Sequence, residues 1–237
     1  MATSRLLMKR ASNKRGTTIS LPKNLITNIV ARVASHSLAD LVNLKRCCKD
    51  FLDAAEDDFA YKHVSLLHKF PLFPWRPLND KKLSFLKRCK ESQNMDTLFR
   101  EGLLEYLRGE KISGLRILKI VALKGHKEAK YVYGMIMLSS EDEELRKEGL
   151  EHMRFLRESK CVIRCRGKVE KLVQYAWKKN ILLHNKKTLC HNKSICKGWR
   201  PREGRWLLLD DEDDNNDNIN MCEYCRWDQE LELFNIH

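Results

Sequence analysis

The sequence contains no apolar run long enough to cross a membrane. A spanning helix needs about 20 consecutive apolar residues, and the 237 residues of this chain include no such run. Near the N-terminus the apolar stretch is only Leu6-Leu7-Met8, whereas the core of a secretory signal has roughly 7 to 15 residues. We therefore expect a soluble protein of the cytoplasm or the nucleus, with no membrane among its partners.

The sequence motifs of several common enzyme classes are also missing. There is no Gly-x-Ser-x-Gly, no His-Glu-x-x-His and no phosphate-binding loop ending in Gly-Lys-Ser or Gly-Lys-Thr. Cys190 and His191 are adjacent, which points their side chains apart and does not pair a nucleophile with a base. A cysteine hydrolase with distant partner residues stays open as an alternative, but the expectation is a non-catalytic protein.

Acidic residues are fewer than basic ones, 32 against 45, which gives a formal net charge of +13. The excess favours acidic proteins or nucleic acid as partners and does not determine the fold. Residues 157–205 hold fifteen Lys or Arg and three acidic residues, with Trp177 and Trp199 among them and Trp206 directly after them. A nucleic-acid-binding module is therefore one alternative, although the acidic run at 210–218 beside this segment can neutralise it internally.

Residues 18–68 predict a small helical unit, preceded by a disordered basic tail at 1–17. The first helix carries an apolar row with a spacing of four, which keeps its members on one side: Leu21, Leu25, Ile29 and Val33. Pro22 suits the first turn of that helix. Ser37, with Asp40 three residues later, predicts the start of a second helix with an apolar face of Leu38, Leu41 and Leu44. A third helical segment follows around Phe51.

This unit resembles an F-box. The features that carry the resemblance are Leu21-Pro22, the aliphatic helix, the break at Ser35–Leu38, and Cys48-Lys49 before Phe51, where many F-boxes have Trp. The resemblance implies docking to the Skp adaptor, and through it to the cullin and RING subunits of an SCF-type ubiquitin ligase. The implied adaptor-binding residues are Leu21, Pro22, Leu25, Ile29, Val33, Leu38, Leu41 and Leu44. An ordinary helical core is the alternative interpretation.

Residues 94–157 contain an internal repeat after a Pro-rich connector and helix at 69–93. Gly102 aligns with Gly134, and Gly114 aligns with Gly149. Each copy has the pattern of two helices, and a period in the thirties predicts a short α-solenoid. The pattern is similar to Sel1-like repeats, relatives of tetratricopeptide repeats. The pair is expected either to bind a protein substrate or to act as a spacer.

The tail at 158–237 predicts a basic helix at Gly167–Asn180 and two cysteine pairs around the acidic loop 210–218. Four thiolates are the ligand set of a structural zinc site, and the expected ligands are Cys190, Cys196, Cys222 and Cys225. Five residues separate the first pair, more than the usual two to four, so His191 is a substitute ligand. The alternative is that the cysteines are small buried apolar residues.

These features together resemble plant F-box proteins with Sel1-like helical repeats and a cysteine-containing tail. The expected fold is all-α, with a three-helix F-box, a short α-solenoid and a small irregular C-terminal module. The expected function is that of the substrate-recognition subunit of an SCF-type ubiquitin ligase, with an unknown protein substrate. The expected cofactor is at most one structural zinc ion, and a zinc-stabilised protein-interaction module is a further alternative.

Overall fold

The computed structural model describes residues 21–66, 70, 78–177, 189–190 and 222–235, and these residues form helices and no strand. The predicted all-α class is confirmed. Across the same residues, no helix has both the length and the apolar character that a membrane span requires. The predicted basic tail at 1–17 and the acidic loop at 210–218 lie outside the described part of the chain.

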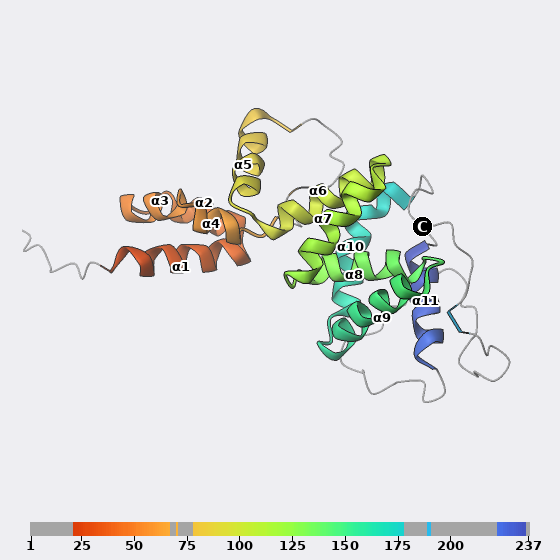
Figure 1. Cartoon of the computed structure of the whole chain (residues 1–237). Coiled ribbons are helices and arrows are strands. Elements are labelled where there is room, and N and C mark those ends of the chain that lie inside the picture. The colour runs from red at the N-terminus through yellow and green to blue at the C-terminus, as the bar shows by residue number, and fades with distance from the viewer. Residues whose placement is uncertain (1–20, 67–69, 71–77, 178–188, 191–221, 236–237) are drawn as a thin grey trace, which may run out of the picture.

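Four helices build the N-terminal unit, one more than the sequence predicts. They are α1 (Lys23–His36), α2 (Leu38–Leu44), α3 (Lys49–Ala55) and α4 (Asp58–His63) (Figure 1). The Ser37 hydroxyl accepts a hydrogen bond from the Asp40 N–H and caps α2, as predicted. The extra helix begins because Asp57 caps it in the same way, with its carboxylate 2.9 Å from the Phe59 nitrogen.

The core of this unit is made by an apolar row on α1 next to the predicted one. Ile26, Val30 and Ala34 are four residues apart and pack against Leu41 of α2 and Ala54 of α3. Val30 and Ala34 have no exposed surface. Helix α1 therefore has two apolar rows, of which the inner one holds the unit together.

Helix α5 (Asp80–Glu91) extends the same core, with buried Cys89 and half-buried Phe85 on its inner side. At the surface, Glu56 joins α5 to the N-terminal unit through ion pairs. The Glu56 carboxylate lies 2.6 Å from Lys45 Nζ and 2.6 Å from Arg88 Nη1. Burial acts to raise the pKa of Glu56, but the hydrogen bonds from Lys45 and Tyr61 outweigh it and the pKa is lowered.

The side chain of Asn94 joins the N-terminal unit to the helices that follow. Its Nδ2 donates to the carbonyl oxygens of Tyr61, Lys62 and Val64, at 2.9, 3.1 and 2.8 Å. Its Oδ1 accepts from the Thr97 N–H at 3.0 Å and so caps the next helix. The buried Asn94 side chain thus binds the end of the N-terminal unit and also caps the first helix of the repeats.

Asp96, two residues after Asn94, makes a second connection. One oxygen accepts from the Leu66 N–H at 2.7 Å, and the other lies 2.9 Å from Nε2 of His126. The His126 Nδ1 accepts from the Ala129 N–H, so its proton is on Nε2 and donates to Asp96. The N-terminal unit is therefore tied to two successive helix pairs.

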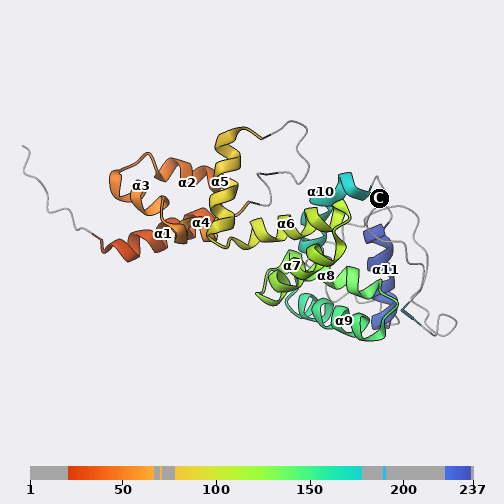
Figure 2. The same cartoon turned by 45° about the horizontal axis from the view of Figure 1, so that its top comes forward.

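Two helix pairs form the predicted repeat. The first is α6 (Met95–Arg108) with α7 (Lys111–Leu123), and the second is α8 (Lys127–Leu138) with α9 (Glu143–Glu158). Helix α10 (Val162–Trp177) packs on the second pair. Both views place α11 (Glu223–Asn235) at the opposite end of the molecule from α1 (Figures 1 and 2).

The aligned glycines are the crossing points of these pairs. A Cβ on Gly114 would lie 2.7 Å from the carbonyl oxygen of Gly102, and a Cβ on Gly149 would lie 2.9 Å from that of Gly134. Equivalent glycine pairs therefore make the same backbone contact in the two copies of the repeat. The sequence repeat is a structural repeat because each crossing has no room for a side chain.

We predict opposite effects for two Gly→Ala substitutions in helices. In Gly114→Ala the added methyl meets the Tyr106 nitrogen at 2.5 Å, so the helices must separate, at an expected loss of about 1–3 kcal/mol. In Gly167→Ala nothing lies within 4 Å, so the higher helix propensity of Ala should stabilise by up to about 1 kcal/mol. Urea denaturation measures both, and equal shifts for the two variants would contradict the crossing.

Candidate functional site

An exposed apolar row runs along the outer side of α1. Leu25 and Ile29 of α1 are 45% and 43% exposed, and Leu21, which precedes the helix, is 44% exposed. Helices α2, α3 and α4 each add one more exposed large side chain, namely Val42, Leu52 and Phe59. A folded unit of this size that leaves so many large apolar side chains in water has the character of a binding surface.

The other residues predicted for adaptor contact lie at different depths. Pro22 is exposed and is the N-cap of α1. Val33, Leu38 and Leu44 are half-buried. Leu41 is 1% exposed and belongs to the core of the N-terminal unit, so its side chain supports the surface from inside and is not part of it.

Three of the four predicted metal ligands come together at the other end of the molecule. The sulfur atoms of Cys190, Cys222 and Cys225 all lie within 4.8 Å of one another, and the Cys190–Cys222 distance is 3.8 Å. In a tetrahedral site with Zn–S bonds of about 2.3 Å, the sulfurs are about 3.8 Å apart. This three-cysteine cluster therefore fits a metal ion. Cys196 and the substitute ligand His191 lie outside the described residues.

Helix α11 positions all three sulfurs. Cys222 precedes its first turn, and the Cys225 N–H donates to Cys222 Sγ at 3.3 Å, as in an N-cap. Asp228, one turn further, accepts from the backbone N–H groups of Leu189 and Cys190 at 2.6 and 3.0 Å. That carboxylate holds Cys190 against the helix, although Cys190 and Cys222 are 32 residues apart in sequence.

A buried ionic contact docks α11 on the repeat helices. Glu230 accepts hydrogen bonds from the Tyr131 hydroxyl at 2.6 Å and from Nε of Arg166 at 2.8 Å. The Phe234 ring packs edge-on to Tyr131, with centroids 5.9 Å apart. Complete burial and the neighbouring Glu230 charge raise the pKa of Tyr131 well above its usual value, so Tyr131 stays a hydrogen-bond donor.

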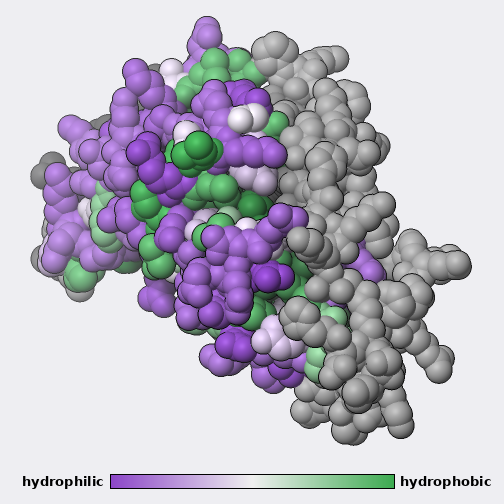
Figure 3. Space-filling model, turned by 45° about the vertical axis from the view of Figure 1, so that its right-hand side comes forward, coloured by the Kyte–Doolittle hydropathy of each residue, from purple (hydrophilic) through white to green (hydrophobic). Residues whose placement is uncertain are grey.

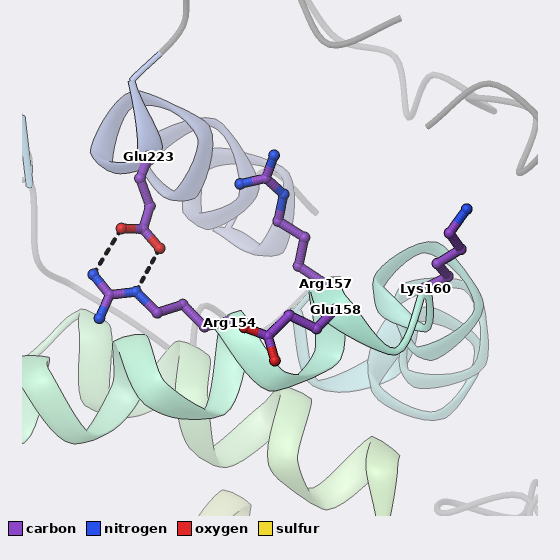
Figure 4. Close-up of a pocket in the computed structure, with 5 residues that line it drawn as sticks. All are labelled: Arg154, Arg157, Glu158, Lys160 and Glu223. Carbon is purple, nitrogen blue, oxygen red and sulfur yellow. Dashed lines mark hydrogen bonds and ion pairs between the residues drawn. The ribbon is translucent and has the colours of Figure 1, made fainter. Parts of the chain in front are cut away.

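A second ion pair lies at the surface, beside a depression of about 510 Å³ lined by α9 and α11 residues (Figure 4). Arg154 binds Glu223 through two bonds of 2.7 Å. The hydrogen bonds and charge of Arg154 lower the pKa of the Glu223 carboxyl. Arg157, Glu158 and Lys160 complete the lining, so the depression carries charges of both signs.

In the view of Figure 3, the residues that the structure describes are mostly hydrophilic, with hydrophobic residues in smaller patches among them. This differs from α1, where exposed aliphatic residues follow one another along a single helix. The two ends of the chain therefore offer different chemistry to a partner.

The sequence interpretation did not identify the polar residues that position these sites. Asn94 has a signal in the sequence, because Asn with Thr three residues later precedes an apolar helix pattern. Asp228 and Glu230 have none, because acidic residues in a helix are usually solvated and their partners are 38 or more residues away. Only the tertiary fold shows that these carboxylates are buried.

Comparison with known proteins agrees with both halves of this picture. Residues 67–174 match the family described as plant tetratrico peptide repeats, a range that covers α5 to most of α10. "Putative F-box protein At1g67623" of Arabidopsis thaliana is 34% identical over 120 residues, which are 50% of this chain and 39% of that protein. No solved structure matches the chain significantly.

A second relative is matched over a larger share of its own length. "F-box protein At2g35280" of Arabidopsis thaliana is 31% identical over 121 residues, which cover 50% of this chain and 72% of that protein. The chain belongs to this family of plant F-box proteins. The plant repeat match covers the helices that follow the N-terminal unit. The chain spans well under half the length of the first of these relatives.

We predict a pH-dependent contribution from the Arg154–Glu223 pair of this F-box protein. A lowered pKa of Glu223 in the folded state means that the pair stabilises the fold above the ordinary value of 4.5. The contribution is lost as the pH falls through the lowered value. Arg154→Met should therefore be less stable than wild type in urea at pH 7, and the difference should shrink at pH 3.

The matched control is Lys147→Met, since Lys147 pairs only with exposed Glu143 and Glu144 of its own helix. Such pairs contribute little, so this variant should unfold like wild type at both pH values. A pH-independent loss in Arg154→Met would show that the side chain acts by packing alone.

Proposed function

We propose that this chain is the substrate-recognition subunit of an SCF-type cullin–RING ubiquitin ligase. Its F-box binds a Skp-type adaptor, which links it to the cullin and RING subunits, and the opposite end of the molecule holds a protein substrate. The chain itself performs no catalysis and acts in the cytoplasm or the nucleus. The observation that carries this proposal is the exposed row on α1 in a chain that belongs to an F-box family.

The row has the geometry that helix docking uses. Leu21, Leu25 and Ile29 follow one another at intervals of four residues, and each leaves over two fifths of its surface in water. Covering side chains of this kind contributes roughly 25 cal/mol for each Å² of apolar area removed from water. Apolar anchors at helical spacing are the usual contacts of a helix with a hydrophobic groove.

The proposed role in ubiquitination is one of effective concentration. A receptor that holds the adaptor at one end and a substrate at the other raises the local concentration of substrate lysines near the conjugating enzyme. The proposal assigns substrate binding to the repeats and the tail, and it takes the repeats to be of the Sel1-like type. The glycine crossings at Gly102–Gly114 and Gly134–Gly149 support helix pairs of that kind.

Charge pairing in the described part of the basic region gives less support to nucleic-acid binding. Arg166 binds buried Glu230, and Lys168 Nζ lies 2.6 Å from the buried carboxylate of Glu128. These two cations are neutralised within the protein and do not face a phosphate backbone. We therefore favour binding of a protein over binding of nucleic acid.

One structural zinc ion is the cofactor that we propose. Cysteine thiolates are soft ligands that bind zinc well, and a structural site takes four ligands, of which Cys196 is the predicted fourth. The three-cysteine cluster supplies three such ligands at fitting distances.

We predict that Leu21→Ala, Leu25→Ala and Ile29→Ala together abolish adaptor binding. Each of these side chains is exposed in the free protein, so the fold should remain. If each anchor contributes at least about 1 kcal/mol, the affinity for the purified adaptor should fall about 100-fold or more. Isothermal titration measures the affinity.

The control combines Ile112→Ala, Ile120→Ala and Leu123→Ala on α7. These side chains are 89%, 47% and 64% exposed and lie outside the F-box, so their removal should leave adaptor affinity unchanged. The proposal is wrong if wild-type protein does not bind the adaptor, or if the α1 and α7 variants bind equally well.

A further inference from the structure

We propose that zinc at Cys190, Cys222 and Cys225 forms a clasp that keeps α11 docked on the repeat helices. This inference rests on the proposed zinc ion and adds what the ion does in the fold. The three ligands come from two segments that are far apart in sequence, one at residues 189–190 and one at the start of α11. A metal ion bound to all three therefore joins these segments with bonds that thiols alone do not make.

Two of the three ligands lie at the N-terminus of α11, and two of the three are almost fully buried. Cys222 and Cys225 occupy the N-cap and the third position of a helix of 13 residues, where the unpaired backbone N–H groups carry partial positive charge. Sulfur is a weak hydrogen-bond acceptor when neutral, whereas a thiolate accepts a bond such as the 3.3 Å contact from the Cys225 N–H more strongly. Cys190 and Cys225 are almost fully buried, at 5% and 1% exposure, which protects bound metal from water.

Asp228 is a positioning residue for this site. Its carboxylate accepts from two successive backbone N–H groups and fixes the segment that carries Cys190. The side chain is 5% exposed, so its charge is removed from water and is compensated there by those two N–H groups. The geometry of the third ligand is therefore set by the same helix that supplies the other two.

Buried charged groups reduce the free energy that docking of α11 on the repeat helices gains without a metal ion. The helix brings two buried carboxylates, Asp228 and Glu230, into the interface. The Glu230–Arg166 contact is buried on both sides, and the desolvation of such a pair offsets much of its attraction. Apolar burial of Trp227 and Phe234 favours docking, and zinc adds free energy that is available only when α11 is in place.

The decisive experiment measures zinc content and the dynamics of α11 on the same full-length protein. We expect about one zinc per chain by plasma mass spectrometry, with substituted cobalt showing sulfur-to-metal charge-transfer absorption. A strong chelator should then speed amide hydrogen exchange in residues 223–235 by about tenfold or more, while exchange in α1 to α4 stays unchanged.

Variants separate metal binding from simple burial. Cys225→Ser should lose the zinc and show the fast α11 exchange without chelator. Cys165→Ser replaces a cysteine that is equally buried but lies outside the cluster, and Cys47→Ser replaces an exposed one. Both should keep about one zinc, even if the first lowers stability. Asp228→Ala should weaken zinc affinity while all three ligands remain.

Different results would contradict the zinc site and the role of zinc in holding α11. Zinc below about a tenth of an equivalent in wild type, or a Cys190–Cys222 disulfide found by thiol counting without reductant, removes the zinc site. Zinc that is bound and lost as described, with α11 exchange unchanged by chelator, removes the clasp and leaves the zinc ion in place. Neither result bears on adaptor binding, which is measured separately.

Discussion

The buried carboxamide of Asn94 is the contact on which the arrangement of this molecule depends. Its nitrogen donates to carbonyl oxygens at the end of α4 and just beyond it, while its oxygen caps α6. Removing a buried hydrogen-bonding group leaves its partners unsatisfied, at about 1–3 kcal/mol each. Asp96 adds a second bond to Leu66 and one to His126. The N-terminal unit is thus held to the helices that follow it by specific hydrogen bonds near its C-terminal end.

This junction connects two ends of the chain that differ in the side chains they expose. The N-terminal end presents aliphatic side chains to water, among them Leu25 and Ile29 of α1. The C-terminal end combines buried carboxylates, a three-cysteine cluster and a depression lined by charges of both signs. A receptor of the proposed type needs both ends in a fixed relation, because the position of a bound substrate relative to the ligase decides which lysines are reached.

Local sequence patterns predicted the helices well, because spacing, caps and glycines act over a few residues. Ser37 caps α2, the α1 row lies outside, and Gly102, Gly114, Gly134 and Gly149 meet at two equivalent crossings. The pattern missed α4, since a helix of six residues carries little periodicity, and it did not show that Leu41 is a core residue.

The candidate sites depended more on tertiary structure. Cysteine spacing suggested a metal site, but the grouping of Cys190 with Cys222 and Cys225 requires a fold that brings residues 32 positions apart together. Nothing local shows that Asp228 binds the backbone beside Cys190 or that Glu230 pairs with Arg166. Such contacts between distant segments cannot be predicted from periodicity, because each residue alone has the pattern of a solvated helix surface.

The most direct test of the central claim, that the F-box and the repeats form one cooperative body, is unfolding of the zinc-saturated protein followed by two probes. All five tryptophans lie outside residues 21–66, so their fluorescence reports the repeats and tail, whereas far-UV circular dichroism reports every helix. The account predicts coincident transitions in wild type and separated ones in Asn94→Ala. Separate transitions in wild type, or an Asn94→Ala variant that unfolds like wild type, would contradict it.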